Sequence, residues 1–381
     1  MKKSMIALRG MTWDHSRGFD PMVATGELFA ARHPQVRISW ERRSLQDFEH
    51  FPVEELAAEY DLIVIDHPHV GGLADAGVLL PFDWRDPKSL HSLAENSVGP
   101  SFPSYHWKGR HWALPIDAAA QVQAWRPDLI EAPLTRWDDV VALARRGRVL
   151  WPLRSPHQLM SFMTLAANRG TPCATEPGAL LAEHDAIAVL EVMRELASLV
   201  PRECRRLDPI ATLEQLATED QWAVAPLTYG YVSYARDDFR QKLVRFANLA
   251  MLGSDGPSGS VIGGTGLAIS AKCAHPEIAF DYAYFTASQD VQRGAYVQSG
   301  GQAGHRAAWL DPSVNRAVNG FYRDTLATLD RSWLRPRHQG YLKFQVDGSS
   351  AIDRFLDGGI GAADTSRELD RLYLTSWDSS E

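Results

Sequence analysis

The chain has 381 residues, more than one hydrophobic core usually supports, and this length favours two domains. Its residues are 45% hydrophobic and 23% charged, a composition typical of globular proteins without long disordered tracts. The formal net charge of -8 argues against a general binder of nucleic acid or of anionic membranes, because both partners require a basic face.

The N-terminal segment has no pattern of a membrane span or an export signal. No run of about 18 apolar residues occurs, so no helix is expected to cross a membrane. Lys2 and Lys3 precede a short apolar run that Arg9 interrupts, whereas a signal peptide needs a longer one. Residues 5–11 are therefore predicted to form the first strand, and a full-length chain of this sequence would be cytoplasmic.

Three cysteines, Cys173, Cys204 and Cys273, show neither a C-x-x-C motif nor the Cys/His spacing of a zinc site. Cys173 and Cys204 lie in loops at the two ends of one predicted helical hairpin, so a disulfide between them is a hypothesis. The alternative is a pair of reduced thiols. Cys273 is expected to be a buried free thiol.

The first third of the chain alternates strands and helices. A strand at 5–11 precedes a helix at 21–33, a strand at 36–40 with alternating hydrophobicity, and a strand at 61–66. The last of these is a continuous apolar run, which is typical of a central parallel strand covered on both faces. The order predicts an α/β layer with ligands at the carboxyl ends of its strands.

A second block begins with a strand at 112–117, and its helix at 133–145 has Thr135 as the expected N-cap. The later elements are predicted as helices at 159–169, 185–199 and 209–217, strands at 222–227 and 266–270, and helices at 276–287 and 289–299. Glycine-rich breaks at 252–266 and 300–304 interrupt this pattern.

The breaks predict where the chain crosses between two lobes. Crossings near Pro115, Leu252 and Gly301 give an N-terminal lobe of residues 1–115 plus 253–302 and a C-terminal lobe of 116–252 plus 303–381. Three connecting segments would form a hinge that closes the lobes around a ligand in the cleft between them.

Five segments carry a resemblance to a known family. They are residues 60–81, which end in Gly77-Val78-Leu79-Leu80-Pro81, residues 106–115, which end in Trp112-Ala113-Leu114-Pro115, and residues 123–130, 133–141 and 262–270. In this order they are similar to family 1 extracellular solute-binding proteins, the maltose-binding-like receptors of carbohydrate importers. Arg126 stands where relatives usually have Asn.

The resemblance implies an α/β fold of the periplasmic-binding-protein type II kind, with two lobes and a three-segment hinge. It further implies a monomeric receptor that traps a small polar solute, a sugar or sugar derivative, and delivers it to the permease of an ABC importer. The family location would be periplasmic. No cofactor, metal or catalytic residue is implied, and nucleic acid and membrane are not expected partners.

The loop after the first strand contains Trp13, Asp14, His15 and Arg17, a set rich enough in functional groups to predict contact with the solute. The alternative is that Asp14 caps the following helix and Arg17 is solvated. Asp66 and His67 end the central strand, where ligands of open α/β sheets bind. A metal at His67 and His69 is disfavoured, because two histidines fall short of three protein ligands.

The other candidates lie at strand ends and in glycine-rich turns. They are Asp117 on the strand that enters the hinge, Tyr229 and Tyr231 after a strand of the second lobe, Gly263 and Gly264, Gln302 and His305, and Tyr341. A tyrosine can stack on the C–H face of a sugar, but it is more often part of a core. Glycines allow a ligand to approach the backbone closely.

Two other classes of protein stay open at this point. An enzyme on the same scaffold would need a catalytic motif, and the sequence has no G-x-S-x-G elbow, P-loop or H-E-x-x-H. A cytoplasmic sensor would keep the solute cleft and the hinge without a transporter. The receptor remains the preferred hypothesis.

Overall fold

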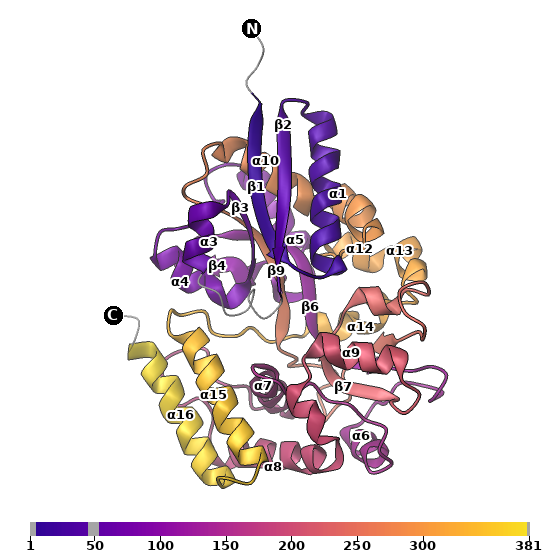
Figure 1. The fold of residues 1–381 in the computed structure, drawn as a ribbon. Coiled ribbons are helices and arrows are strands. Elements are labelled where there is room, and N and C mark those ends of the chain that lie inside the picture. The colour runs from indigo at the N-terminus through magenta and orange to yellow at the C-terminus, as the bar shows by residue number, and fades with distance from the viewer. Residues whose placement is uncertain (1–4, 45–52, 379–381) are drawn as a thin grey trace. The chain divides into compact units, whose positions relative to one another are not determined.

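The structure, a computed structural model, describes residues 5–44 and 53–378. It divides into two compact units, each with its own set of elements (Figure 1). Unit 1 comprises Met1–Ala118 and Gly263–Arg316, and unit 2 comprises Ala119–Ile262 and Ala317–Glu381. The chain therefore passes from one unit to the other three times.

Each boundary lies later in the chain than the expected 115, 252 and 302. Residues after 252 stay with unit 2 because the Asn168 Oδ1 accepts hydrogen bonds from the backbone of Leu252 and Gly253 at 2.7 and 3.1 Å. Residues after 302 stay with unit 1 because the Gly304 N–H donates to the Ile116 carbonyl at 3.0 Å. Hydrogen bonds thus keep residues 252–253 with unit 2 and Gly304 with unit 1, beyond two of the three expected crossings.

The strands pair in the order β2-β1-β3-β9-β6-β7, with β8 also paired to β6, and the first four of these strands belong largely to unit 1. Their bounds are Ile6–Trp13 (β1), Val36–Arg43 (β2), Leu62–Asp66 (β3) and Ile262–Ile269 (β9). β1 is parallel to β2 and β3, whereas β9 is antiparallel to β3 and pairs Thr265 with Asp66. Unit 1 also contains a small hairpin of β4 (His106–Trp107) and β5 (Arg110–His111).

The continuous apolar run of β3 is explained by burial on both faces. Leu62 and Val64 belong to one hydrophobic cluster with Met22 and Phe280. Ile63 and Ile65 point the other way, into a second cluster that includes Tyr105. This confirms the predicted coverage of both faces. β3 was expected to be a central parallel strand, and it is parallel to β1 on one side but antiparallel to β9 on the other.

Helices cover the sheet of unit 1, and α1 runs beside β1 and β2 in Figure 1. The helices are α1 (Ser16–Arg32), α3 (Val53–Glu59), α4 (Val70–Asp75), α5 (Pro87–Asn96), α10 (Pro276–Ala287), α11 (Gln289–Val291), α12 (Arg306–Leu310) and α13 (Pro312–Ala317), which ends at the boundary. α1 starts five residues before the expected Pro21, because the His15 side chain caps its first turn and Pro21 is accommodated inside the helix.

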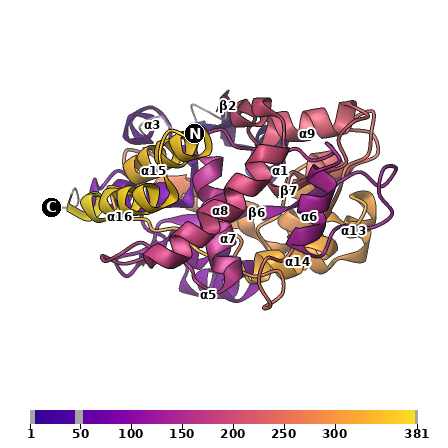
Figure 2. The ribbon, with the colours of Figure 1, turned by 90° about the horizontal axis from the view of Figure 1, so that it is seen from below.

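In unit 2, β6 (Ala113–Trp125) continues beyond unit 1 and pairs antiparallel with β7 (Val224–Tyr229) and β8 (Arg245–Ala247). Its helices are α6 (Trp137–Ala144), α7 (His157–Arg169), α8 (Glu183–Leu199), α9 (Pro209–Thr218), α14 (Phe321–Asp330), α15 (Tyr341–Leu356) and α16 (Ala362–Asp378). The last two lie side by side in Figure 2.

Two smaller expectations are corrected in unit 2. Arg136, not Thr135, is the N-cap residue of α6, because the Thr135 carbonyl accepts a hydrogen bond from the Met251 N–H. The cysteines are free and buried, so Cys173 and Cys204 form no disulfide. The Cys204 sulfur instead accepts a hydrogen bond from the Trp151 backbone at 3.5 Å.

None of the helices in residues 5–44 and 53–378 combines the length and the apolar character that a membrane crossing requires.

Candidate functional site

The loop between β1 and α1 distributes its polar residues over different environments. Trp13 is 3% exposed and belongs to the core of unit 1, where its indole packs so closely on Gly18 that a Cβ there would lie 2.4 Å from the ring. Asp14 is exposed and pairs with Arg42 at 3.2 Å. His15 is half-buried, and its Nδ1 accepts a hydrogen bond from the Arg17 N–H at 3.0 Å. This bond begins α1.

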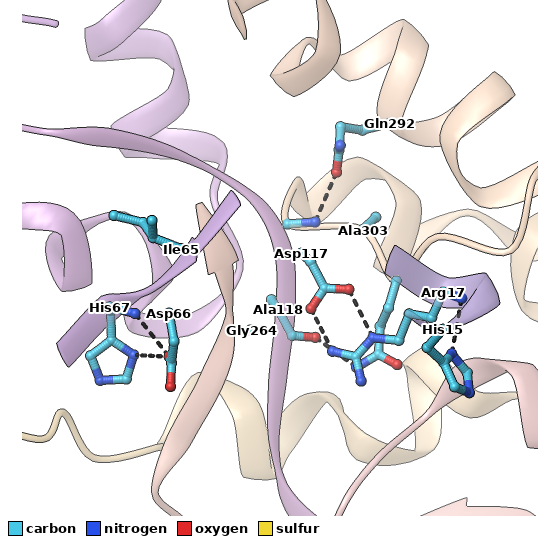
Figure 3. A network of polar contacts seen from close by, with 12 residues as sticks. His15, Arg17, Ile65, Asp66, His67, Asp117, Ala118, Gly264, Gln292 and Ala303 are labelled. Carbon is cyan, nitrogen blue, oxygen red and sulfur yellow. Dashed lines mark hydrogen bonds and ion pairs between the residues drawn. The ribbon is translucent and has the colours of Figure 1, made fainter. Parts of the chain in front are cut away.

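Arg17 lies on the first turn of α1 and forms a fork with Asp117 of β6 (Figure 3). The Nε donates to Oδ2 at 2.8 Å and Nη2 donates to Oδ1 at 2.5 Å. Both side chains are buried, with 4% and 0% of their surfaces exposed. A bidentate charge-assisted pair of this kind fixes the orientation of both groups.

Burial raises the pKa of the Asp117 carboxyl, while the positive charge of Arg17 and the backbone of Gln302 act in the opposite direction. The guanidinium stays protonated in any case. The pair is therefore a compact ionic contact that joins residues a hundred positions apart in the sequence.

Asp66 and His67 form a second polar group at the carboxyl end of β3. The Asp66 carboxylate accepts a hydrogen bond from the His67 N–H at 2.8 Å and lies 3.2 Å from the His67 Nδ1. His67 is buried, whereas 22% of the Asp66 side chain is exposed. In Figure 3 this group and the Arg17–Asp117 pair lie on opposite sides of β6 and β9, so unit 1 keeps them as two separate clusters.

Residues 302–305 pack against the backbone around Asp117. Gln302 is fully buried, and its Nε2 donates to the Ala118 carbonyl at 2.8 Å. Ala303 pairs with Asp117 as an isolated antiparallel bridge. His305 is 5% exposed and caps α12 by accepting from the Ala307 N–H at 3.2 Å, and burial lowers its pKa. Gln302 and His305 thus hold the backbone in place.

Gly263 and Gly264 begin the part of β9 that belongs to unit 1, and both are partly exposed. Gly264 has a φ of +99°, and a Cβ at this position would lie 2.4 Å from the Asp117 carbonyl oxygen. Only glycine satisfies both conditions. These glycines were expected to let a ligand approach the backbone closely. At Gly264 the group that approaches is the backbone of β6 at Asp117.

The remaining candidates belong to unit 2. Tyr229 ends β7, where its ring meets His157 edge-on with 6.1 Å between centroids. Tyr231 is 6% exposed and precedes a short 3-10 helix. Tyr341 is fully buried at the start of α15, with its hydroxyl 3.9 Å from the sulfur of Met163. Tyr341 is therefore part of the core of unit 2.

Sequence reasoning missed Gln292, which is fully buried in unit 1. Its Oε1 accepts a hydrogen bond from the Gly304 N–H at 2.8 Å (Figure 3). Its Nε2 donates to the Thr286 carbonyl at 3.0 Å. Residues 292–296 form a π-helical turn, although a regular helix was expected over 289–299. The one feature of the sequence that could have indicated an irregular helix here is Gly294, because glycine is unfavourable in a helix interior.

Among the described residues, no three His, Cys, Asp or Glu side chains are grouped so that they could hold a metal ion. Asp66 and His15 keep partial exposure, whereas Arg17, Asp117, Gln302 and His305 are occupied with internal contacts.

A family model described as bacterial extracellular solute-binding protein matches residues 29–308. The match covers more than half of the chain. The chain belongs to this family.

Solved structures of several solute-binding proteins have the same fold. The maltose-bound MalE3 protein of T. maritima is 17% identical, with a TM-score of 0.82 over 97% of this chain and 100% of that one. The GacH receptor of Streptomyces glaucescens is 14% identical, with a TM-score of 0.81 over all of both chains. A solute-binding protein of Thermotoga lettingae bound to α-D-tagatose is 15% identical, with a TM-score of 0.79 over 98% and 100%. The α/β fold is that of a periplasmic-binding-protein-like receptor.

Arg126 has a structural role in this solute-binding protein. It is completely buried, and its Nε and Nη2 fork onto Asp128 at 2.8 and 2.7 Å. Its Nη1 donates to the carbonyls of Leu216 and Glu219 at 2.9 and 2.7 Å, at the carboxyl end of α9. The arginine thereby satisfies carbonyl groups that a helix end leaves without partners.

Proposed function

We propose that this solute-binding protein captures a sugar or polyol outside the cytoplasm and delivers it to the permease of an ABC importer. The family match supports the binding of a solute. The sugar class is supported by relatives in complex with maltose and α-D-tagatose, and by a relative described with acarbose. Each of these relatives aligns over nearly the whole of both chains.

The observation that carries the proposal within unit 1 is the placement of Asp66. It lies at the carboxyl end of β3, a position where ligands of α/β sheets bind, and its carboxylate is oriented by the His67 N–H. A carboxylate held in this way can accept hydrogen bonds from sugar hydroxyls. Its partial exposure leaves it accessible to a small molecule.

The direct test is thermal unfolding in the presence of maltose, α-D-tagatose, ribitol and acarbose, with glutamate as a non-carbohydrate control. A ligand at about 100 times its Kd should stabilise the fold by about 2.7 kcal/mol through mass action. The sugar should be recovered unchanged. Turnover of the sugar, or no shift with any carbohydrate, would contradict the proposal.

The role of Asp66 is tested by Asp66→Ala, with Asp75→Ala as the matched control. Both carboxylates are in unit 1, with 22% and 28% of the side chain exposed. Asp75, however, ends α4 and pairs with Lys108, which lies in the turn between β4 and β5. Titration calorimetry with the stabilising sugar should show a loss of at least about tenfold in affinity for Asp66→Ala, the cost of a lost charged hydrogen bond. Equal affinities for the two variants would remove Asp66 from the site.

A further inference from the structure

The Arg17–Asp117 pair connects a loop that follows a strand end to the strand by which the chain leaves unit 1. Arg17 is on the first turn of α1, directly after the loop that begins at Trp13. Asp117 is one residue before Ala118, the last residue of unit 1 on β6. The fork uses Nε and Nη2, the two nitrogens along one edge of the guanidinium.

The backbone of Asp117 is also held by Gly264, which lies next to the second crossing, and by residues 302–304, which stay within unit 1. On one side Gly264, the second residue of unit 1 on β9, approaches so closely that no Cβ fits. On the other side Ala303 forms its bridge with Asp117. The Ala118 N–H donates to the Gln302 carbonyl at 3.2 Å, next to the contact from the Gln302 side chain. We call residues 116–118, 264 and 302–304 the crossing cluster.

Gln292 holds the crossing cluster from the helical side. Its Oε1 accepts from Gly304, while Gly304 also donates to Ile116. The π-helical turn at 292–296 places this amide within reach of Gly304. Hydrogen bonds among its own residues and to Gln292 therefore hold the crossing cluster together. Arg17 adds a charged contact between this cluster and α1.

Stability is a weak explanation for a buried ion pair. Such pairs repay the desolvation of two charges only partly, and apolar residues of similar volume often serve as well. Their geometry, however, sets a unique register between the segments that carry them. The register fixed here is between the loop of His15 and the crossing cluster.

We propose that the Arg17–Asp117 pair is a positioning contact, which couples the order of the loop between β1 and α1 to that of the crossing cluster, and that this order is required for solute capture. This inference rests on the proposed function. Arg17 and Asp117 act through the backbone they hold, and neither needs to touch the solute. They are positioning residues.

The first test is hydrogen–deuterium exchange in the unliganded protein, which needs no solute. Asp117→Asn keeps the shape of the side chain and removes its charge, and we expect exchange at residues 15–19, 116–118 and 302–304 to accelerate together by about tenfold or more. Peptides of β3 should be unchanged. Acceleration in only one of the three segments, or an equal acceleration throughout unit 1, would overturn the coupling.

The second test separates positioning from stability with the variant Arg17→Met/Asp117→Leu, which replaces both charges by apolar groups. Its denaturation midpoint should stay near that of the wild type, while its affinity for the sugar that stabilises the wild type falls about tenfold or more. Arg17→Lys, which keeps the charge but not the fork, should recover only part of that affinity. Wild-type affinity in the stable double variant would overturn the inference.

The matched control is Arg126→Met, which removes a buried arginine fork of unit 2. It should lower the denaturation midpoint without accelerating exchange in the crossing cluster. If Arg17→Met/Asp117→Leu does not fold, the exchange result for Asp117→Asn decides the coupling. If no sugar in the panel stabilises the wild type, the proposed function fails, whereas the exchange result still tests the inference.

Discussion

Arg126 and Arg17 are both buried arginines that fork onto a carboxylate, but they differ in what else they hold. Besides its contact with the half-exposed Asp128, Arg126 donates hydrogen bonds to two backbone carbonyls at the end of α9. Truncation of this side chain would leave those carbonyls without a partner, and an unsatisfied buried acceptor costs more than the bond contributed. Arg126 is therefore expected to stabilise unit 2.

We predict that Arg126→Met lowers the free energy of unfolding by about 2–4 kcal/mol. Urea denaturation followed by tryptophan fluorescence measures this change. The control is Arg145→Met, which removes an exposed arginine paired with Glu195 and should cost less than about 1 kcal/mol. Similar losses for both variants would show that the buried contacts of Arg126 have no special weight.

At the scale of elements, α16 is held to the loop before α15 by His338. The imidazole stacks on Trp377 at 3.6 Å between centroids, and its Nε2 lies 2.8 Å from the Ser376 hydroxyl. Burial lowers the pKa of His338 to about 4, from an ordinary value of 6.5. The neutral imidazole is thus the form that the docked helix accepts.

The sign of the pH effect follows from this lowered pKa. The unfolded chain takes up a proton on His338 below pH 6.5, whereas the folded chain does so only near pH 4, so stability present above 6.5 is lost as the pH falls between these values. The loss should reach at most about 3 kcal/mol. His338→Phe keeps the ring stack and removes the titration, so its unfolding midpoint should depend less on pH over this range. Parallel pH profiles of the two proteins would contradict the assignment.

At the scale of the whole molecule, two compact units are joined by three crossings of the chain. Each unit has its own buried core. Three connecting segments are the arrangement expected of a receptor that closes by hinge bending.

We predict that a sugar that raises the melting temperature also lowers the radius of gyration in small-angle scattering, because capture closes the hinge. A sugar from the same panel that gives no thermal shift serves as the control and should leave the scattering unchanged. An unchanged radius of gyration at saturation with the stabilising sugar would count against closure, but not against solute binding.

Much of the fold could be predicted because it depends on local patterns. The apolar run at 62–65 predicts a strand covered on both faces, and the two core clusters confirm it. The helix expected at 276–287 has the same bounds in the structure. The start of α1 was missed because a histidine cap is a weak signal in sequence, and the π-helical turn at 292–296 was missed because helix periodicity does not distinguish it from a regular helix.

By itself, the sequence determined the α/β class, the alternation of strands and helices, and which loops follow strand ends, because hydrophobic periodicity and turn residues act over a few positions. Only the tertiary structure decided how the polar residues of those loops are used. Arg17 and Asp117 each resembled a solute contact, yet they bind each other across a hundred positions. Which polar group meets which depends on long-range packing and on the desolvation that burial imposes, and no local pattern records either.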